Sequence, residues 1–450
     1  MILLWVMACD GTVEDTTPPV DTQVTHHATY ESAKACGACH PVHYWEWSQS
    51  MHAYAAKSPV FDAMAAKAWR DTSGGVGSFC TRCHTPFGEF EGEPGNSVAA
   101  ERSELSLEGV SCDYCHTAVG HDGVIANTRQ VNEPGRVKQG PIGGGDYGAH
   151  EGQYGEFLTS PELCGTCHDV VSDGLRIEEA YTEYIASPAA AEGTRCQDCH
   201  MSPEPGVDIE REMIAISRVN GVDGPIRSHA SHRFIGPDYS LLDSFPWEDD
   251  PEGSALARED MNRQIQTLLG NAAMLAAVNV TPTERTLQIQ VAVQSLVNAH
   301  NVPTGFTSER QMWLHVRVTD SLGNVAFESG GLDENQDLYD THSEVGPVDD
   351  SLVNYQSTNL LVKRNNGRSF EVETIFPFDA NAIVKHSLEP NEIRLHTWET
   401  ADLPSTLWTV EVSLNYRNLP PYVFRALGAD HLIERLQVFT IDSWSGTVQL

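Results

Sequence analysis

Residues 36–40 read Cys-Gly-Ala-Cys-His and are the first of five Cys-x-x-Cys-His segments that decide what the N-terminal half of the chain can become. Two cysteines three positions apart lie on one face of a helical turn, so both can form thioether bonds to one porphyrin. The histidine that follows is placed to ligate the iron. The motif residues are Cys36, Cys39, His40, Cys80, Cys83, His84, Cys112, Cys115, His116, Cys164, Cys167, His168, Cys196, Cys199 and His200. We therefore expect five covalently attached haem c groups, one per motif.

Two other uses of paired cysteines fit the pattern less well. Zinc sites commonly take two Cys-x-x-Cys pairs per ion. Five pairs cannot be grouped evenly in this way, and zinc gives no reason for a histidine directly after every pair. Five tight Cys-x-x-Cys disulfides would connect no distant parts of the chain. The histidine after each pair therefore favours haem over zinc or disulfides.

The net charge narrows the choice of partners. The 450 residues include 28 Lys and Arg against 63 Asp and Glu, which gives a formal net charge of −35. Such a surface repels nucleic-acid phosphates and favours partners with a basic surface. We expect no nucleic-acid partner, and we expect a redox partner protein that docks through a basic surface.

The composition divides the chain into four regions. Residues 1–28 form a leader and a flexible tether. Residues 29–240 carry every paired cysteine, and we expect a pentahaem cytochrome domain that is mainly helical and irregular, with a haem-packed core and little sheet. Residues 241–280 form an acidic linker followed by a helix. In residues 281–450 apolar side chains alternate with polar ones, as at Leu287, Ile289, Val291 and Val293, which predicts an all-β sandwich.

The N-terminus resembles the end of a bacterial lipoprotein signal, in which Cys9 of Met7-Ala8-Cys9 would be lipidated. The apolar run before Cys9 is too short to span a bilayer and has no preceding Lys or Arg. The alternative is a plain apolar terminus with an unrelated cysteine. We expect an exported protein, periplasmic or on the cell surface, with a possible lipid anchor at Cys9.

A resemblance to a known family extends this interpretation. The first motif is followed by Trp-Ser-Gln-Ser-Met-His at residues 47–52, the fourth is Ser-Pro-Glu-Leu-Cys-Gly-Thr-Cys-His at 160–168, and the fifth continues into Met201. These segments resemble the multihaem cytochromes c related to the tetrahaem electron acceptor of hydroxylamine oxidoreductase, over about residues 29–240. The fifth motif and the C-terminal domain depart from those tetrahaem relatives.

The resemblance implies candidates for the second axial ligand of each haem. It implies that His52 and His150 serve as distal ligands, and that residues 231–236 carry another, with His232 and His229 competing. We expect a helix from Tyr44 to Ala56 to turn His52 toward a haem of another motif. Residues 298–305, followed by Arg310 and Trp313, resemble a β-domain found after haem domains, so that His300 either reaches back to a haem or is a turn histidine without iron.

Two classes of function remain open at this stage. Five haems held by about 200 residues must pack closely, and mostly bis-histidine ligation gives an electron carrier with no catalytic residue. The alternative is a reductase or oxidoreductase of a small nitrogen or sulfur compound at one open haem. A third interpretation, a structural subunit of an extracellular electron conduit, is compatible with electron transfer. We favour electron transfer over an enzyme.

Overall fold

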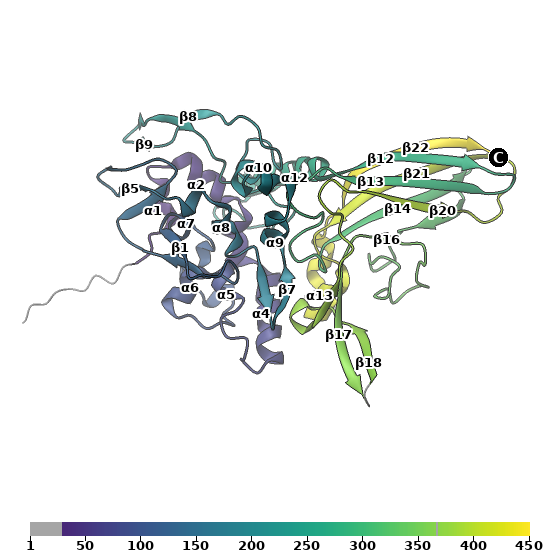
Figure 1. Ribbon diagram of the computed structural model, residues 1–450, viewed down its shortest axis with the longest axis horizontal. Coiled ribbons are helices and arrows are strands. Elements are labelled where there is room, and N and C mark those ends of the chain that lie inside the picture. Colours follow the sequence, from purple (N-terminus) through teal and green to yellow (C-terminus); the bar gives the residue numbers. More distant parts are fainter. Residues whose placement is uncertain (1–28, 366–367) are drawn as a thin grey trace, which may run out of the picture.

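The computed structural model describes residues 29–365 and 368–450. An N-terminal half of short helices and hairpins lies beside a C-terminal half of long strands (Figure 1). The expected leader and tether, residues 1–28 with Cys9, lie outside the described residues. No helix within the described residues is both long enough and apolar enough to cross a membrane.

A short helix lies at each of the five motifs. These helices are α1 (Ala33–Gly37), α5 (Thr81–His84), α7 (Cys112–His116), α8 (Pro161–Gly165) and α11 (Cys196–His200). The whole motif lies within α7 and α11, whereas the other three helices contain part of it. The backbone N–H of His40 donates to the carbonyl of Cys36 at 2.8 Å, and that of His168 donates to Cys164 at 2.9 Å. This bond between residues four apart closes a turn, so the first cysteine and the histidine of a motif lie on the same helical face.

Other short helices connect these turns. They are α2 (Pro41–Ser48), α3 (Met51–Tyr54), η1 (Ala55–Lys57), α4 (Pro59–Asp71), α6 (Pro86–Glu91), η2 (Ala99–Glu101), η3 (Ser106–Glu108), η4 (Phe157–Thr159), α9 (Ala180–Ile185) and α10 (Pro188–Glu192). The buried apolar cluster that belongs to this half alone is small: Ala33, Trp47, Ala53, Tyr54 and Phe245. So few apolar side chains give this half little core of its own.

The N-terminal half contains more strand than the expected "little sheet". In the described residues, eleven strands of two to four residues pair locally: β1 (Ala118–His121), β2 (Gln130–Asn132), β3 (Val137–Gly140), β4 (Gly145–Asp146), β5 (Glu151–Tyr154), β6 (Val170–Ser172), β7 (Leu175–Glu178), β8 (Met213–Ala215), β9 (Arg218–Val219), β10 (Val222–Asp223) and β11 (Ile226–Ser228). Runs this short carry no readable alternation of apolar and polar residues, which is why the sequence did not indicate them.

The helix expected from Tyr44 to Ala56 is interrupted. α2 ends at Ser48, and α3 begins after Ser50, whose hydroxyl accepts a hydrogen bond from the Ala53 N–H at 3.3 Å. A serine in this position is a favourable N-cap, so the chain starts a new helix with His52 in its first turn. Gly109 (φ +67°) packs on this turn, because a Cβ there would lie 2.3 Å from the His52 carbonyl oxygen.

The helix in the expected linker leads directly into the sandwich. α12 (Pro251–Ala272) is the helix expected after the acidic stretch, with Asp250 as its N-cap. Its buried face carries Met261 and Ile265. It is followed at once by β12 (Ala273–Pro282), so the first strand begins within the region expected to be linker.

The C-terminal half consists of two facing sheets and a projecting hairpin (Figure 1). One sheet has the order β12–β13–β20, the other β15–β14–β21–β22 with β16 beside β14, and the hairpin sheet is β18–β17–β19. The remaining elements are β13 (Leu287–Ser295), β14 (Gln311–Asp320), β15 (Val325–Ser329), β16 (Val353–Asn354), β17 (Thr358–Asn365), β18 (Arg368–Glu373), η5 (Pro377–Asp379), β19 (Ala382–Val384), β20 (Ile393–Glu399), β21 (Leu407–Arg417), α13 (Pro421–Leu427), η6 (Asp430–Arg435) and β22 (Phe439–Gln449). The alternating residues of β13 and β14 form the fully buried interior.

The loop between β13 and β14 docks the sandwich onto the N-terminal half. Glu183 of α9 accepts hydrogen bonds from the Asn301 N–H at 3.1 Å and from the Thr304 hydroxyl at 2.6 Å. Arg310 donates both terminal nitrogens to Asp238, at 2.5 and 2.8 Å. These contacts fix the position of His300, which lies in the same loop.

Candidate haem-binding site

Four of the five motif histidines face a second imidazole across a similar gap. His40 also lies 6.1 Å from His43, its near neighbour in the sequence. The pairs between distant segments, with the separation of their ring centroids, are His40 and His150 at 6.3 Å, His52 and His168 at 6.3 Å, His116 and His232 at 6.4 Å, and His200 and His300 at 6.2 Å. The two members of each pair come from segments far apart in the chain, so tertiary folding brings them together.

This spacing fits a haem iron held between two imidazoles. A metal–imidazole bond is about 2 Å long, so two rings on opposite sides of one iron have centroids roughly 6.3 Å apart. Desolvation by burial lowers the pKa of His52 to about 3, which leaves its imidazole neutral at pH 7. A neutral imidazole is the form that ligates a metal. Among the described residues, no group of three or more His, Cys, Asp or Glu is arranged to hold a single ion.

His232 and His229 are the two candidates for the distal ligand in and just before residues 231–236. The structure brings only His232 close to a motif histidine. The Nε2 atom of His229 lies 3.0 Å from Glu46 Oε2. The same carboxylate oxygen accepts the backbone N–H of His232 at 3.0 Å. Glu46 thus holds the side chain of His229 and the backbone of His232 through the same carboxylate oxygen. The ring of His229 faces none of the motif histidines.

His84 of the second motif differs from the other four. In the described part of the chain, the one aromatic ring packed against it is that of Phe61. The two rings are stacked, with their centroids 4.2 Å apart and an interplanar angle of 9°. A ring stacked on the face of an imidazole orients it but cannot ligate the iron. No described imidazole therefore faces His84 at the spacing of the other four pairs.

The Nδ1 atoms of four motif histidines have partners that orient the rings, whereas His84 Nδ1 is buried without a partner among the described residues. His40 Nδ1 lies 2.7 Å from the carbonyl oxygen of Ile216, and His116 Nδ1 lies 2.7 Å from that of Gln139. A donor bond from Nδ1 leaves Nε2 free to ligate. His168 Nδ1 instead faces a carboxylate, Glu178 Oε1, at 3.3 Å.

Cysteines of different motifs meet in the interior. Direct side-chain interactions join Cys36 to Cys112, Cys83 to Cys167, and Cys164 to Cys196. The Thr128 hydroxyl lies 2.5 Å from Cys83 Sγ and 3.9 Å from Cys167 Sγ. These contacts place motif one beside three, two beside four, and four beside five.

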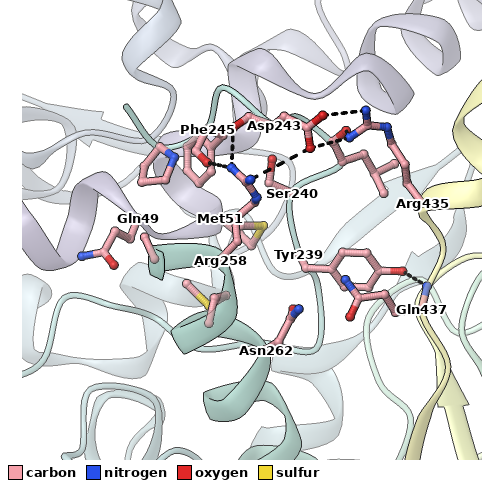
Figure 2. A pocket seen from close by; sticks show the side chains of 14 residues that line it. Gln49, Met51, Tyr239, Ser240, Asp243, Phe245, Arg258, Asn262, Arg435 and Gln437 are labelled. Carbon is pink, nitrogen blue, oxygen red and sulfur yellow. Dashed lines mark hydrogen bonds and ion pairs between the residues drawn. The ribbon is translucent and has the colours of Figure 1, made fainter. Parts of the chain in front are cut away.

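A cavity of about 220 Å³ lies where the two halves meet (Figure 2). Met51 lines it from the N-terminal half. Arg435 donates to both carboxylate oxygens of Asp243 at 2.8 Å, and Arg258 donates to the Phe245 carbonyl at 2.8 Å. Its charged groups thus satisfy one another and none of the paired imidazoles lines it, so the cavity belongs to the seam between the halves and not to the haem-binding site.

Sequence reasoning missed two carboxylates of this site, Glu46 and Glu178. Both are buried, at 7% and 6% exposed. The chain has 63 acidic residues, so neither stands out in a single sequence. Only the fold shows that each contacts a histidine.

Of the comparisons with known proteins, one matches a part of the chain and another matches its overall fold. The family model "Cytochrome c554 and c-prime" matches residues 35–117. The structure of a penta-heme cytochrome c552 from Thermochromatium tepidum superposes with a TM-score of 0.59 at 16% identity, covering 93% of this chain and 99% of that chain. No curated protein matches the sequence significantly.

Proposed function

We propose that this chain is an exported pentahaem c-type cytochrome that transfers electrons through closely packed, mostly bis-histidine haems. The family match and the shared fold support a multihaem electron-transfer cytochrome with covalently bound haem c. The observation that carries the proposal is the set of four imidazole pairs with centroids 6.2–6.4 Å apart, each pair containing one motif histidine.

Each motif supplies two thiols for attachment and one axial imidazole. The opposite imidazole is assigned to His150 for motif one, His232 for motif three, His52 for motif four and His300 for motif five. Haem c, when bound, supplies an iron that takes up and releases one electron. The ligand from His300 makes the sandwich a functional part of the cytochrome, because it completes the fifth site from the other half.

The cysteine contacts arrange the motifs as a connected series. Motif one adjoins three, and motif four adjoins both two and five. Cys115 of motif three and Cys167 of motif four are close enough for their charges to interact. The protein therefore holds its five sites in the order one, three, four, five, with two beside four.

Motif two supports a second candidate function. His84 has no second imidazole within the described residues, so its iron can bind a small molecule. If the protein is a reductase or oxidoreductase of a small nitrogen or sulfur compound, motif two is therefore the site at which we expect the reaction. The four paired sites would then deliver or remove its electrons.

Location and partners follow from the same proposal. Thioether attachment of haem to such motifs resembles a periplasmic process, which supports a location outside the inner membrane, in the periplasm or on the cell surface. The net charge of −35 favours a redox partner with a basic docking surface. Lipid anchoring at Cys9 concerns a residue outside the described part and is a separate proposal.

An EPR spectrum of the oxidised holoprotein, followed by a cyanide titration, tests the ligation pattern. We expect four low-spin haems and one high-spin haem, with one cyanide bound per molecule, because within the described residues only the histidine of motif two lacks a facing imidazole. Five low-spin haems without cyanide binding would refute the open site. Two or more high-spin haems would refute the assignment of imidazole pairs.

A further inference from the structure

One of the motif histidines has an acidic partner. His40 and His116 bond through Nδ1 to backbone carbonyls at 2.7 Å, and His200 Nδ1 lies 3.4 Å from the Ile235 carbonyl. His168 Nδ1 bonds to the carboxylate of Glu178 at 3.3 Å. A carbonyl is a neutral acceptor, whereas a carboxylate adds a full negative charge beside the ligating ring.

Glu178 is fixed in place, and no Lys or Arg of the described residues pairs with it. It ends β7, paired with Val170 of β6, and its side chain is 7% exposed. Within the described residues its one ion-pair partner is His168, whereas the neighbouring Glu179 pairs with Lys385 at 2.5 Å. The docking loop of the sandwich passes close to it, since a Cβ on Gly305 would lie 4.0 Å from Glu178 Oε1.

A buried charge in this position has a defined effect on a ligated iron. Reduction adds one electron and lowers the charge of the site by one. An anion nearby therefore stabilises the oxidised form more than the reduced form. A carboxylate that accepts the Nδ1–H bond also makes the imidazole a more basic ligand, which favours the oxidised form again. The other motif histidines lack this partner.

We propose that Glu178 is a potential-tuning residue that lowers the reduction potential of the motif-four haem. The inference rests on the proposed function and goes beyond it by assigning one residue to one site. Motif four adjoins motifs two and five through its cysteines, so Glu178 controls how electrons distribute at the branch of the series.

A redox titration of full-length Glu178→Gln holoprotein, followed by EPR, tests this proposal. Glutamine keeps the size and a hydrogen-bond acceptor but removes the charge. The motif-four haem is identified as the one whose low-spin signal is lost in His52→Ala. At a fixed potential we expect its ratio of reduced to oxidised iron to rise on the order of tenfold, which corresponds to 59 mV for a one-electron couple. The other four ratios should change little.

Glu179→Gln is the matched control, because it removes the adjacent carboxylate, which does not touch His168. We expect no shift of the motif-four signal in this variant. An unchanged titration of Glu178→Gln, or an equal shift in Glu179→Gln, would overturn the tuning role. Intact-mass measurement of both variants separates this failure from failure of the proposed function, which would show as missing covalent haem.

Discussion

Replacing His52 by Ala is expected to convert one low-spin haem to high-spin and to raise its reduction potential. The ring of His52 lies 6.3 Å from that of His168, so the variant removes the second imidazole of motif four and leaves that iron open. Loss of a basic ligand also destabilises the oxidised iron, which raises the potential. EPR of the oxidised protein and a redox titration measure the two effects.

His121→Ala provides the matched control for this prediction. His121 packs against Phe157 and faces none of the motif histidines. We expect its EPR spectrum and titration to equal those of the unaltered protein. If His52→Ala also leaves both unchanged, His52 is not an axial ligand and the assignment for motif four is wrong.

Replacing Glu309 by Gln is expected to stabilise the protein at neutral and alkaline pH. Burial raises the pKa of Glu309 to about 7, with Arg310 lowering it and Asp238 raising it. The residue is 8% exposed and precedes β14 beside the docking contacts. Ionising it in the folded protein is therefore unfavourable, whereas in the unfolded chain it ionises near its ordinary pKa of 4.5.

The sign follows from these two pKa values. Below pH 4.5 the Glu309 carboxyl is protonated in both the folded and the unfolded protein, so it does not lower the free energy of unfolding. Between pH 4.5 and 7 the unfolded chain loses its proton first, so the free energy of unfolding falls as pH rises, and the loss is complete above pH 7. The difference of 2.5 pKa units corresponds to about 3 kcal/mol. Glu309→Gln removes this loss.

Denaturant unfolding of the holoprotein at pH 4.5 and pH 8 measures the effect. We expect Glu309→Gln to match the unaltered protein closely at pH 4.5 and to exceed it by about 3 kcal/mol at pH 8. Glu284→Gln, in the exposed turn between β12 and β13, should change the free energy of unfolding little at either pH. Equal stability of Glu309→Gln and the unaltered protein at pH 8 would show that Glu309 ionises freely.

Local spacing carried most of what the sequence could predict. The turn of each motif depends on residues at most four apart, and the alternation in β13 follows from burial of one face. Both are readable without the fold. His52, His150, His232 and His300 were named from resemblance, but their pairing with particular motifs depends on contacts between distant segments.

The choice between His232 and His229 shows why the rest could not be predicted. It depends on Glu46, which lies 183 residues before His229 in the sequence and contacts it only in the folded chain. The interrupted helix before His52 depends on one cap, Ser50, in a run of residues that otherwise favours helix. Glu178 is a stronger case, since its role exists only because β7 places it against His168.

Intact-mass spectrometry of the purified protein after acid–acetone extraction tests the central claim most directly. Extraction removes haem that is held only by its iron ligands, whereas thioether-bound haem stays with the chain. The account predicts a mass equal to that of the polypeptide plus five haems, and peptide mapping should place one haem on each Cys-x-x-Cys-His motif. A polypeptide mass without haem, or with fewer than five, would contradict it.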